Sequence, residues 1–453
     1  MTPAAESRVP IRPSPPLARA LIRSLTRGTA IAEGVRYIHV GHEKWLAAQR
    51  ELLGEIAEDG HADTKFVRGA YGAGKSHFLS MVQDLARESG WATSHIECKA
   101  DGVQIDRFET LYPQITNKLT AADVAASGPD PSDAPRDAVL FVLEKWAREQ
   151  ARRSGVREGG LTRPFDADVR VHSYLEKGLL RSNLPPDFVR ALTVFARAHL
   201  ARDTESMMSV SAWVAGADVR VSLPSSYLQR PNARVPESGR FDLRPIGKGT
   251  ARDALRGLLW LVRSAGYSGL VLCIDEIEEL AKLGNRKRQD QALQALREFV
   301  DHAGGEGGFR NLCMYLAATP DMFEGEHYFL RYDALATRIQ AVSSEINWRN
   351  PVIDLDRTRL TSAELRAMAS RIRDVYGLAH PDTTQLESLS DGAIQTLLDH
   401  VMEAKFRIAK PRLLARVVVD ILERSRQGAT GISSDYRALV ESAASQISKE
   451  IGA

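Results

Sequence analysis

Residues 66–79 read FVRGAYGAGKSHFL and are the most informative stretch of this 453-residue chain. From Gly69 to Ser76 they match the pattern G-x-x-x-x-G-K-[ST] at every position. β-prone residues precede the glycines and an amphipathic segment follows them, so the stretch is expected to run strand, loop, helix. Glycines let the backbone curl until its N–H groups face an anion, and the helix N-terminus adds its positive dipole end. The alternative, a chance match in a turn, does not account for this context.

The motif predicts ATP and Mg²⁺ as ligands and gives two side chains specific roles. Lys75 is expected to reach the β- and γ-phosphates, and the Ser76 hydroxyl is expected to bind Mg²⁺. The residues predicted to contact the nucleotide here are Gly69, Ala70, Tyr71, Gly72, Ala73, Gly74, Lys75, Ser76 and His77.

A second motif, LVLCIDE, occupies residues 270–276. Its apolar run predicts a central strand that is covered on both faces. Asp275, at the tip of that strand, is then expected to hold the hydration shell of Mg²⁺. Glu276 is expected to act as the general base that activates the attacking water. The alternative is a solvated acidic turn, because Glu278 and Glu279 follow.

Three further residues are candidates for catalytic roles. Thr319 follows the apolar run at 312–318, where its hydroxyl would bind the attacking water or the γ-phosphate; capping the turn before Pro320 is the alternative. Arg338 and Arg412 are candidates for stabilising transition-state charge. Since the chain has many arginines, a surface position is the alternative for both of them.

The order of expected elements predicts the fold and the domains. Strands and helices alternate around the two motifs, which favours an α/β fold with a parallel sheet. After residue 360 the pattern is helical throughout. We therefore expect a flexible tail at 1–18, a core built from 19–104 and 226–355, a helical insertion at 105–225 and a helical lid at 356–453.

Composition narrows the class of protein. The net charge of +2 gives no general attraction to nucleic acid, so DNA contact would need a local basic patch. Three isolated cysteines match neither a disulfide framework nor a zinc site, and buried core thiols are expected. No long apolar run predicts a membrane span, and prolines interrupt the first twenty residues where a signal peptide would be apolar. We expect a cytoplasmic protein.

Together these features resemble the AAA+/STAND branch of P-loop ATPases. Residues 40–43, VGHE, are similar to the short motif near the adenine in that branch, which implies nucleotide contacts for Val40 and Gly41. The usual arginine of that motif is His42 here. A helical insertion would explain the 200 residues between Lys75 and Asp275.

One family resembles the chain over nearly its whole length, the BREX-system ATP-binding proteins of the BrxD type. The resemblance implies ATP binding, slow hydrolysis, a role in defence against phage, and association with DNA or a DNA helicase. The stretches that carry it are Ile22–Gly28, VGHE, 66–79, Leu111–Ile115, Trp213–Gly216, SAGYSGLVLCIDEIEEL (264–280), Tyr332–Arg338 and Lys410–Leu414.

Two other functions remain open from the sequence. The first is a nucleotide-dependent switch or scaffold with negligible turnover. The second is an initiator-like DNA-binding ATPase, which would carry a winged helix at its C-terminus. The sequence leaves the oligomeric state open, and an Arg338 that acts on a neighbouring subunit would require a homo-oligomer.

Overall fold

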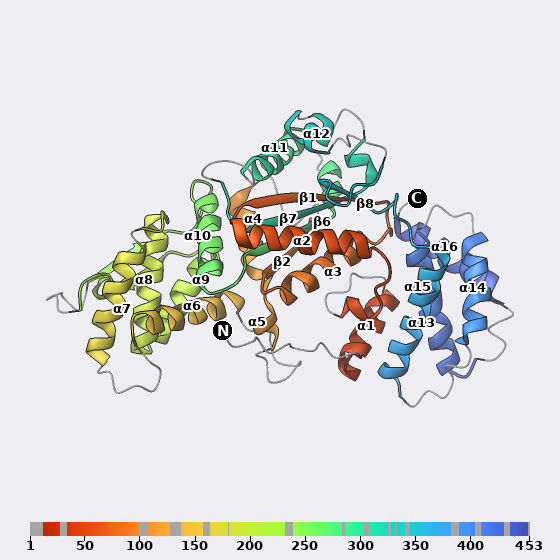
Figure 1. The fold of residues 1–453 in the computed structure, drawn as a ribbon, viewed down its shortest axis with the longest axis horizontal. Helices are drawn as coiled ribbons and strands as arrows, with labels where there is room; N and C mark the ends of the chain where they lie inside the picture. The colour runs from red at the N-terminus through yellow and green to blue at the C-terminus, as the bar shows by residue number, and fades with distance from the viewer. Residues whose placement is uncertain are drawn as a thin grey trace.

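The structure is a computed structural model, and it describes most of the chain. The described residues are 12–27, 34–98, 107–126, 137–156, 164–179, 181–231, 239–282, 286–302, 308–324, 328–331, 333–339, 345–381, 389–403, 409–429 and 435–451. The expected tail at 1–18 lies largely outside them. Figure 1 shows a central sheet with one group of helices, α6–α10, on one side and another, α13–α16, on the other.

The central sheet has six strands in the order β3-β2-β6-β7-β1-β8. Every neighbouring pair is parallel except β2 and β3. The mixed α/β architecture with a mostly parallel sheet agrees with the expected fold class. The strands are β1 (Ala62–Arg68), β2 (Ala92–Glu97), β3 (Leu119–Thr120), β6 (Leu270–Asp275), β7 (Leu312–Ala318) and β8 (Val352–Asp354).

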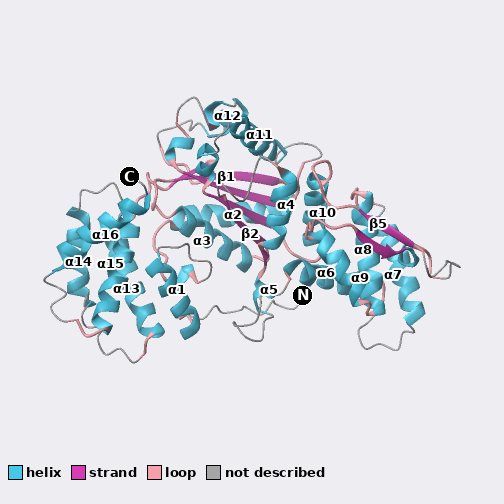
Figure 2. Cartoon of the chain, turned by 180° about the vertical axis from the view of Figure 1, so that it is seen from behind, coloured by secondary structure: helices cyan, strands magenta, loops and turns pink. Residues whose placement is uncertain are grey.

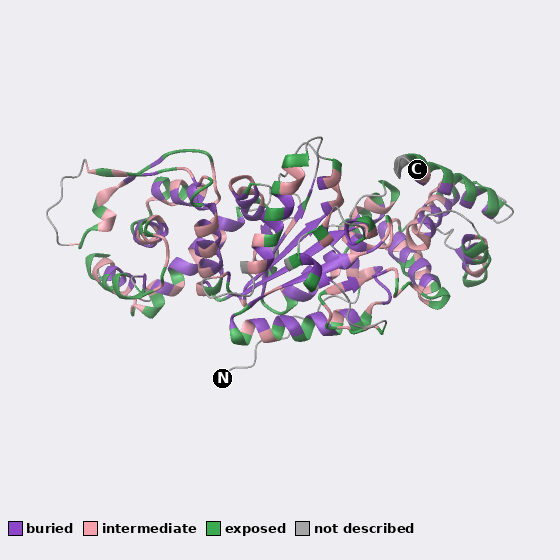
Figure 3. Cartoon of the chain, turned by 90° about the horizontal axis from the view of Figure 1, so that it is seen from above, coloured by how far each residue is buried: buried purple, intermediate pink, exposed green. Residues whose placement is uncertain are grey.

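The apolar runs at 270–275 and 312–318 form β6 and β7, and all their residues are buried (Figure 3). Their side chains alternate between two separate clusters, because successive residues of a strand point to opposite faces. Helices cover both faces, as expected for a parallel sheet. One cluster contains α2 (Glu43–Asp59) and α3 (Lys75–Glu88), and the other contains α4 (Phe108–Asn117), α10 (Ala251–Ser264) and α11 (Arg286–His302).

Parallel strands bring the ends of distant segments to one edge of the sheet. Glu97 at the end of β2 pairs in register with Asp275 at the end of β6. Arg68 at the end of β1 pairs with Ala318 on β7 and with Asp354 on β8. The glycine loop and the acidic strand tip therefore emerge at the same carboxyl edge, with only β7 between their strands.

The region between β3 and β6 is mainly helical, and its helix α10 packs against α4, which contacts strand β2 of the central sheet (Figure 2). Gly257 on α10 leaves room for Phe188 on α8, since a Cβ there would lie 2.5 Å from the ring. Two short strands in this region, β4 (Val221–Pro224) and β5 (Arg240–Leu243), pair antiparallel. The helices of this region are α5 (Ala122–Ala126), α6 (Ala138–Arg153), α7 (Pro164–Leu179), α8 (Pro186–Ala201) and α9 (Thr204–Val214).

The C-terminal residues form a separate helical core that includes the start of the chain. α1 (Pro15–Arg27) packs against α13 and α15, so segments almost 350 residues apart lie side by side (Figure 1). A short 3-10 helix (Val35–Tyr37) and the residues that follow it, Ile38 and Val40, contribute to the same core. The C-terminal helices are α13 (Ser362–Ala379), α14 (Asp391–Glu403), α15 (Lys410–Arg426) and α16 (Tyr436–Ile451).

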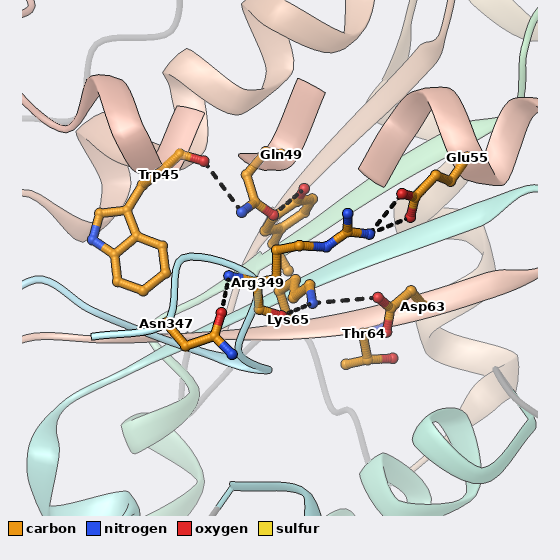
Figure 4. A network of polar contacts seen from close by, with 9 residues as sticks. Trp45, Gln49, Glu55, Asp63, Thr64, Lys65, Asn347 and Arg349 are labelled. Carbon is orange, nitrogen blue, oxygen red and sulfur yellow. Dashed lines mark hydrogen bonds and ion pairs between the residues drawn. The ribbon is translucent and has the colours of Figure 1, made fainter. Parts of the chain in front are cut away.

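A polar network joins the turn before β8 to strand β1 and helix α2 (Figure 4). The buried Lys65 on β1 donates to the Arg349 carbonyl (3.0 Å) and lies 3.4 Å from Asp63. The Arg349 guanidinium in turn binds Glu55 on α2. Just beyond β8, Asp356 accepts a hydrogen bond from the Ala70 N–H (2.8 Å). The segment that leads into the C-terminal helices is thereby bound directly to the glycine loop.

Candidate functional site

A cavity of about 470 Å³ lies at the carboxyl edge of the sheet, where the core meets α1 and the C-terminal helices. Its volume is within the range of small-molecule pockets. Polar residues of the two sequence motifs line one part, and apolar residues line another. The lining residues are Leu25, Ile38, Val40, His42, Tyr71, Gly72, Ala73, Gly74, Lys75, Ser76, His77, Glu97, Asp275, Glu276, Glu278, Leu360, Met368, Ile372, Pro411, Arg412, Ala415 and Arg416.

The glycine loop runs from the end of β1 to the start of α3, as its sequence predicts. Gly72 and Gly74 have φ values of 79° and 99°, a left-handed backbone that glycine adopts without penalty. A Cβ at Gly74 would meet nothing within 4 Å, so backbone conformation rather than space favours glycine there. Gly74 is also the N-cap of α3 and makes no side-chain cap. The N-terminal N–H groups and the dipole of α3 thus face the cavity.

The two motifs meet at Ser76 and Asp275. The Ser76 hydroxyl hydrogen-bonds to the Asp275 carboxylate, which is only 2% exposed. Burial alone would raise the pKa of Asp275, but the neighbouring His95 and Ser76 side chains outweigh it and hold that pKa below its ordinary value. Asp275 is therefore a buried, ionised carboxylate beside a hydroxyl, which is the donor set expected for a hydrated Mg²⁺ ion.

Glu276 follows with an unusual backbone. Its φ is 58°, in the left-handed region that non-glycine residues seldom adopt, and its N–H donates to Asp275 Oδ1 (2.9 Å). Such strain concentrates at functional sites. The side chain faces the cavity, where burial first and then the charge of Asp275 raise its pKa. A carboxylate with a raised pKa is a better proton acceptor than an ordinary one.

Glu278, on the 3-10 helix Ile277–Lys282, reaches back over the loop lysine. Its carboxylate lies 3.7 Å from Lys75 Nζ and accepts a hydrogen bond from the Thr319 N–H (3.2 Å). Lys75 Nζ also donates to the Gly69 carbonyl (3.0 Å), and its side chain is only 7% exposed. The cation of the loop is therefore engaged by protein oxygens in this structure.

The apolar part of the cavity is formed by α1, by residues 38–40 and by helix α13. Three histidines lie around it. His39 and His77 are stacked, with 2.9 Å between His39 Nδ1 and His77 Nε2, and His42 lines the cavity. Burial lowers the pKa of His77 to about 3 and that of His39 to about 4, so both are neutral at pH 7. This uncharged end of the cavity suits a planar, weakly polar group.

Helix α15 of the C-terminal core lines the cavity opposite the glycine loop. The Arg412 guanidinium lies 4.7 Å from the centroid of the Tyr71 ring, a distance suited to a cation–π contact. Arg412 and Arg416, one turn apart on α15, both line the cavity opposite the loop. The structure thus brings one of the two candidate arginines to the predicted site.

Not every predicted residue lines this cavity. Gly41, Gly69 and Ala70 lie next to lining residues without lining it themselves. Thr319 does not line it either: its N–H donates to Glu278, its carbonyl accepts the Met322 N–H, and its side chain makes no capping hydrogen bond to the 3-10 helix Pro320–Met322. Arg338 belongs to α12 (Asp333–Ile339), but its side chain lies outside the described residues.

Sequence reasoning did not select Glu97, Glu278 or Arg416. Glu278 belongs to the run of acids after Asp275, which the sequence analysis uses only for the alternative of a solvated acidic turn. Glu97 is the last residue of β2, and no motif in the sequence marks it. Nothing local marks Arg416, because only the folded C-terminal core brings it to the loop.

Within the described ranges, no cluster of three or more acidic, histidine or cysteine side chains could hold a metal ion by itself. Mg²⁺ does not need such a cage, since it keeps water ligands and binds substrate phosphates. The three cysteines are buried free thiols, as expected. No helix in the described part of the chain is long and apolar enough to cross a membrane.

The fold and the site define a class: an α/β protein whose glycine loop and acidic strand tip share one cavity. Residues 14–434 match the family model of the BREX system ATP-binding protein BrxC/D, and the chain belongs to that family. The match confirms the resemblance stated from sequence. It supports ATP binding and a role in BREX defence. No curated protein matches the chain.

Proposed function

We propose that this cavity binds Mg-ATP and hydrolyses it, with the phosphates on the glycine loop and the adenine in the apolar part. The observation that carries the proposal is the hydrogen bond between Ser76 and Asp275. Their motifs lie 200 residues apart in sequence, yet they meet at the mouth of a loop with an anion-binding backbone.

The chain's own residues would divide the work as follows. Lys75 exchanges its contact with Glu278 for the β- and γ-phosphates. Ser76 and Asp275 hold Mg²⁺, which when bound neutralises phosphate charge. Glu276 accepts a proton from the attacking water while the water oxygen bonds to the γ-phosphorus. The bond between the γ-phosphorus and the bridging oxygen of the β-phosphate breaks, which releases ADP and phosphate. Arg412 stabilises the charge that develops on the transferred group.

The C-terminal helices would act as a lid. α13 and α15 contribute lining residues, and Asp356 links the segment before α13 to the loop. A ligand that contacts both the core and these helices can bias their relative position, because it binds one arrangement better. We propose that nucleotide state is relayed in this way to DNA or to a helicase partner, and that the insertion at 105–225 takes part.

A switch with negligible turnover is the second candidate function. The contact between Glu278 and Lys75 favours it, because the lysine must be released before it can bind phosphate. The initiator-like alternative gains no support, since the described residues from 362 to 451 form helices without the strands of a winged helix.

Nucleotide binding and phosphate release test the proposal. Lys75→Ala should lose binding of a fluorescent ATP analogue, whereas Lys177→Ala, at an exposed position on α7, should bind like the wild type. Glu276→Gln should bind ATP but release phosphate at least a hundredfold more slowly, in line with the loss of a general base. Normal phosphate release by Glu276→Gln would exclude Glu276 as the base.

The same assay separates the two candidate functions. Phosphate release is measured for the wild type alone, with duplex DNA, and with the co-purified helicase of the same system. Turnover in any of these mixtures that Glu276→Gln abolishes supports the ATPase. Binding without turnover in all of them supports the switch.

A further inference from the structure

A seam of polar side chains joins α3 to strands β2 and β6. Arg87 donates to Thr93 Oγ1 (3.2 Å), and a hydrogen bond of 3.0 Å joins Gln83 Nε2 to His95 Nδ1. At the N-terminal end of the same helix, Ser76 hydrogen-bonds to Asp275. His95 therefore lies beneath α3 and next to the acidic strand tip, although it is not part of either sequence motif.

The hydrogen bonds of Gln83 determine which ring nitrogen of His95 is an acceptor. Gln83 Nε2 also lies 3.3 Å from the Leu79 carbonyl oxygen. A carbonyl can only accept, so the Gln83 atom at that position must be the amide nitrogen, with its second hydrogen directed to His95. His95 Nδ1 must then be an acceptor without a proton. The ring nitrogen that carries a proton is then Nε2.

That proton is directed at Asp275. His95 Nε2 is buried, has no hydrogen-bond partner in the described structure, and lies 3.9 Å from Asp275 Oδ2. The other carboxylate oxygen, Oδ1, already accepts the Glu276 N–H. A buried donor without a hydrogen bond lowers the stability of the fold, so the position of His95 Nε2 beside one oxygen of Asp275 calls for an explanation.

We propose that Gln83 and His95 form a relay that positions the Asp275 carboxylate for a divalent cation. This inference rests on the proposed function. His95 Nε2–H lies 3.9 Å from Oδ2 and attracts it, and the Glu276 N–H donates to Oδ1, so both groups favour one orientation of the carboxylate at the strand tip. Gln83 contributes by excluding the other tautomer, which would present a lone pair to the carboxylate. Residues that orient a metal ligand in this way change metal affinity by about ten- to a hundredfold.

The direct test measures divalent-cation affinity rather than activity. Binding of a fluorescent ADP analogue is titrated with MgCl₂, and Mn²⁺ binding to the ADP complex is followed by loss of its free EPR signal. His95→Phe should raise the Mg²⁺ concentration for half-maximal effect by about ten- to a hundredfold. Binding of the analogue without divalent cation should stay the same. His95→Gln, whose amide N–H can reach Asp275, should recover part of the loss.

His61→Phe is the matched control, because His61 is exposed at the edge of β1 and faces no acidic strand tip. It should leave the Mg²⁺ titration unchanged. Equal Mg²⁺ requirements for wild type, His95→Phe and His95→Gln would overturn the inference while leaving the ATP site intact. Failure of the wild type to bind nucleotide under any condition would instead refute the proposed function.

The tautomer can be observed in the unaltered protein, whatever the stability of the variants. Two-bond ¹⁵N–¹H spectra of ¹⁵N-histidine-labelled protein distinguish Nε2–H from Nδ1–H, and His95→Gln identifies the signal. Nε2–H is expected in the wild type, and Gln83→Leu should allow a mixture. An Nδ1–H or doubly protonated His95 at pH 7 in the wild type would contradict the relay.

Discussion

Replacing Glu278 by Gln should tighten ATP binding. Glu278 lies 3.7 Å from Lys75 Nζ and also accepts the Thr319 N–H, so it occupies the position between two groups that would contact the γ-phosphate. Gln keeps the shape of the side chain and an oxygen for Thr319, and removes only the charge. The variant therefore isolates the competition between carboxylate and phosphate for the lysine.

The magnitude follows from the distance. Two unit charges 3.7 Å apart attract by about 4.5 kcal/mol at an effective dielectric constant of 20, and by about 1 kcal/mol in water. The Glu278 side chain is 20% exposed, and part of the attraction persists when nucleotide binds, so about 1–2 kcal/mol should be gained. This corresponds to a roughly five- to thirtyfold lower Kd.

Calorimetric titration of ATP and ADP into wild type and variant measures the effect. The gain should be larger for ATP than for ADP and should shrink at high salt, because it is electrostatic. Glu279→Gln is the matched control, since Glu279 lies one residue further on and pairs with Lys282 (2.6 Å) outside the cavity. Unchanged or weaker ATP binding by Glu278→Gln, with Glu279→Gln like the wild type, would refute the reasoning.

Three further outcomes are expected. Gly72→Ala should weaken ATP binding by about 1–2 kcal/mol, because the φ of Gly72 is 79° and the new Cβ would lie 3.3 Å from Arg412. The control Gly54→Ala, on the exposed face of α2 with open space around it, should leave ATP binding unchanged. The free energy of unfolding should fall as pH drops from 6.5 toward 4, by about 1.4 kcal/mol per pH unit for each of His39 and His77, because the unfolded chain takes up protons that the folded chain excludes. Urea titrations should show a pH dependence of the unfolding free energy that is steeper, by about that amount, in the wild type than in His39→Asn/His77→Asn. Arg197→Leu should lower the free energy of unfolding by about 2–4 kcal/mol in thermal unfolding, because Arg197 is buried, binds Asp168 with two hydrogen bonds and donates to three carbonyls. The control Arg190→Leu, at an exposed position, should change it by less than about 0.5 kcal/mol.

Much of the core was accessible to sequence reasoning because its signals are local. The pattern of residues 69–76 requires a curled backbone between a strand and a helix, and β1 and α3 have those positions. The run at 270–274 is apolar at every position, as a strand covered on both faces must be. Helical periodicity also predicted the helices after residue 360. These properties depend on neighbours within about ten residues, so no knowledge of the fold was needed.

Only the tertiary structure brought α1 and Arg416 to the cavity, paired β4 with β5, and placed Glu278 against Lys75 and His95 against Asp275. These contacts join segments far apart in sequence, and their partners carry no periodicity or motif that identifies one to the other. The sequence alone determined which loop can hold a phosphate and which strand ends in a carboxylate. The folded chain decided which side chains face them, because strand order and helix packing follow from burying all the apolar surfaces at once.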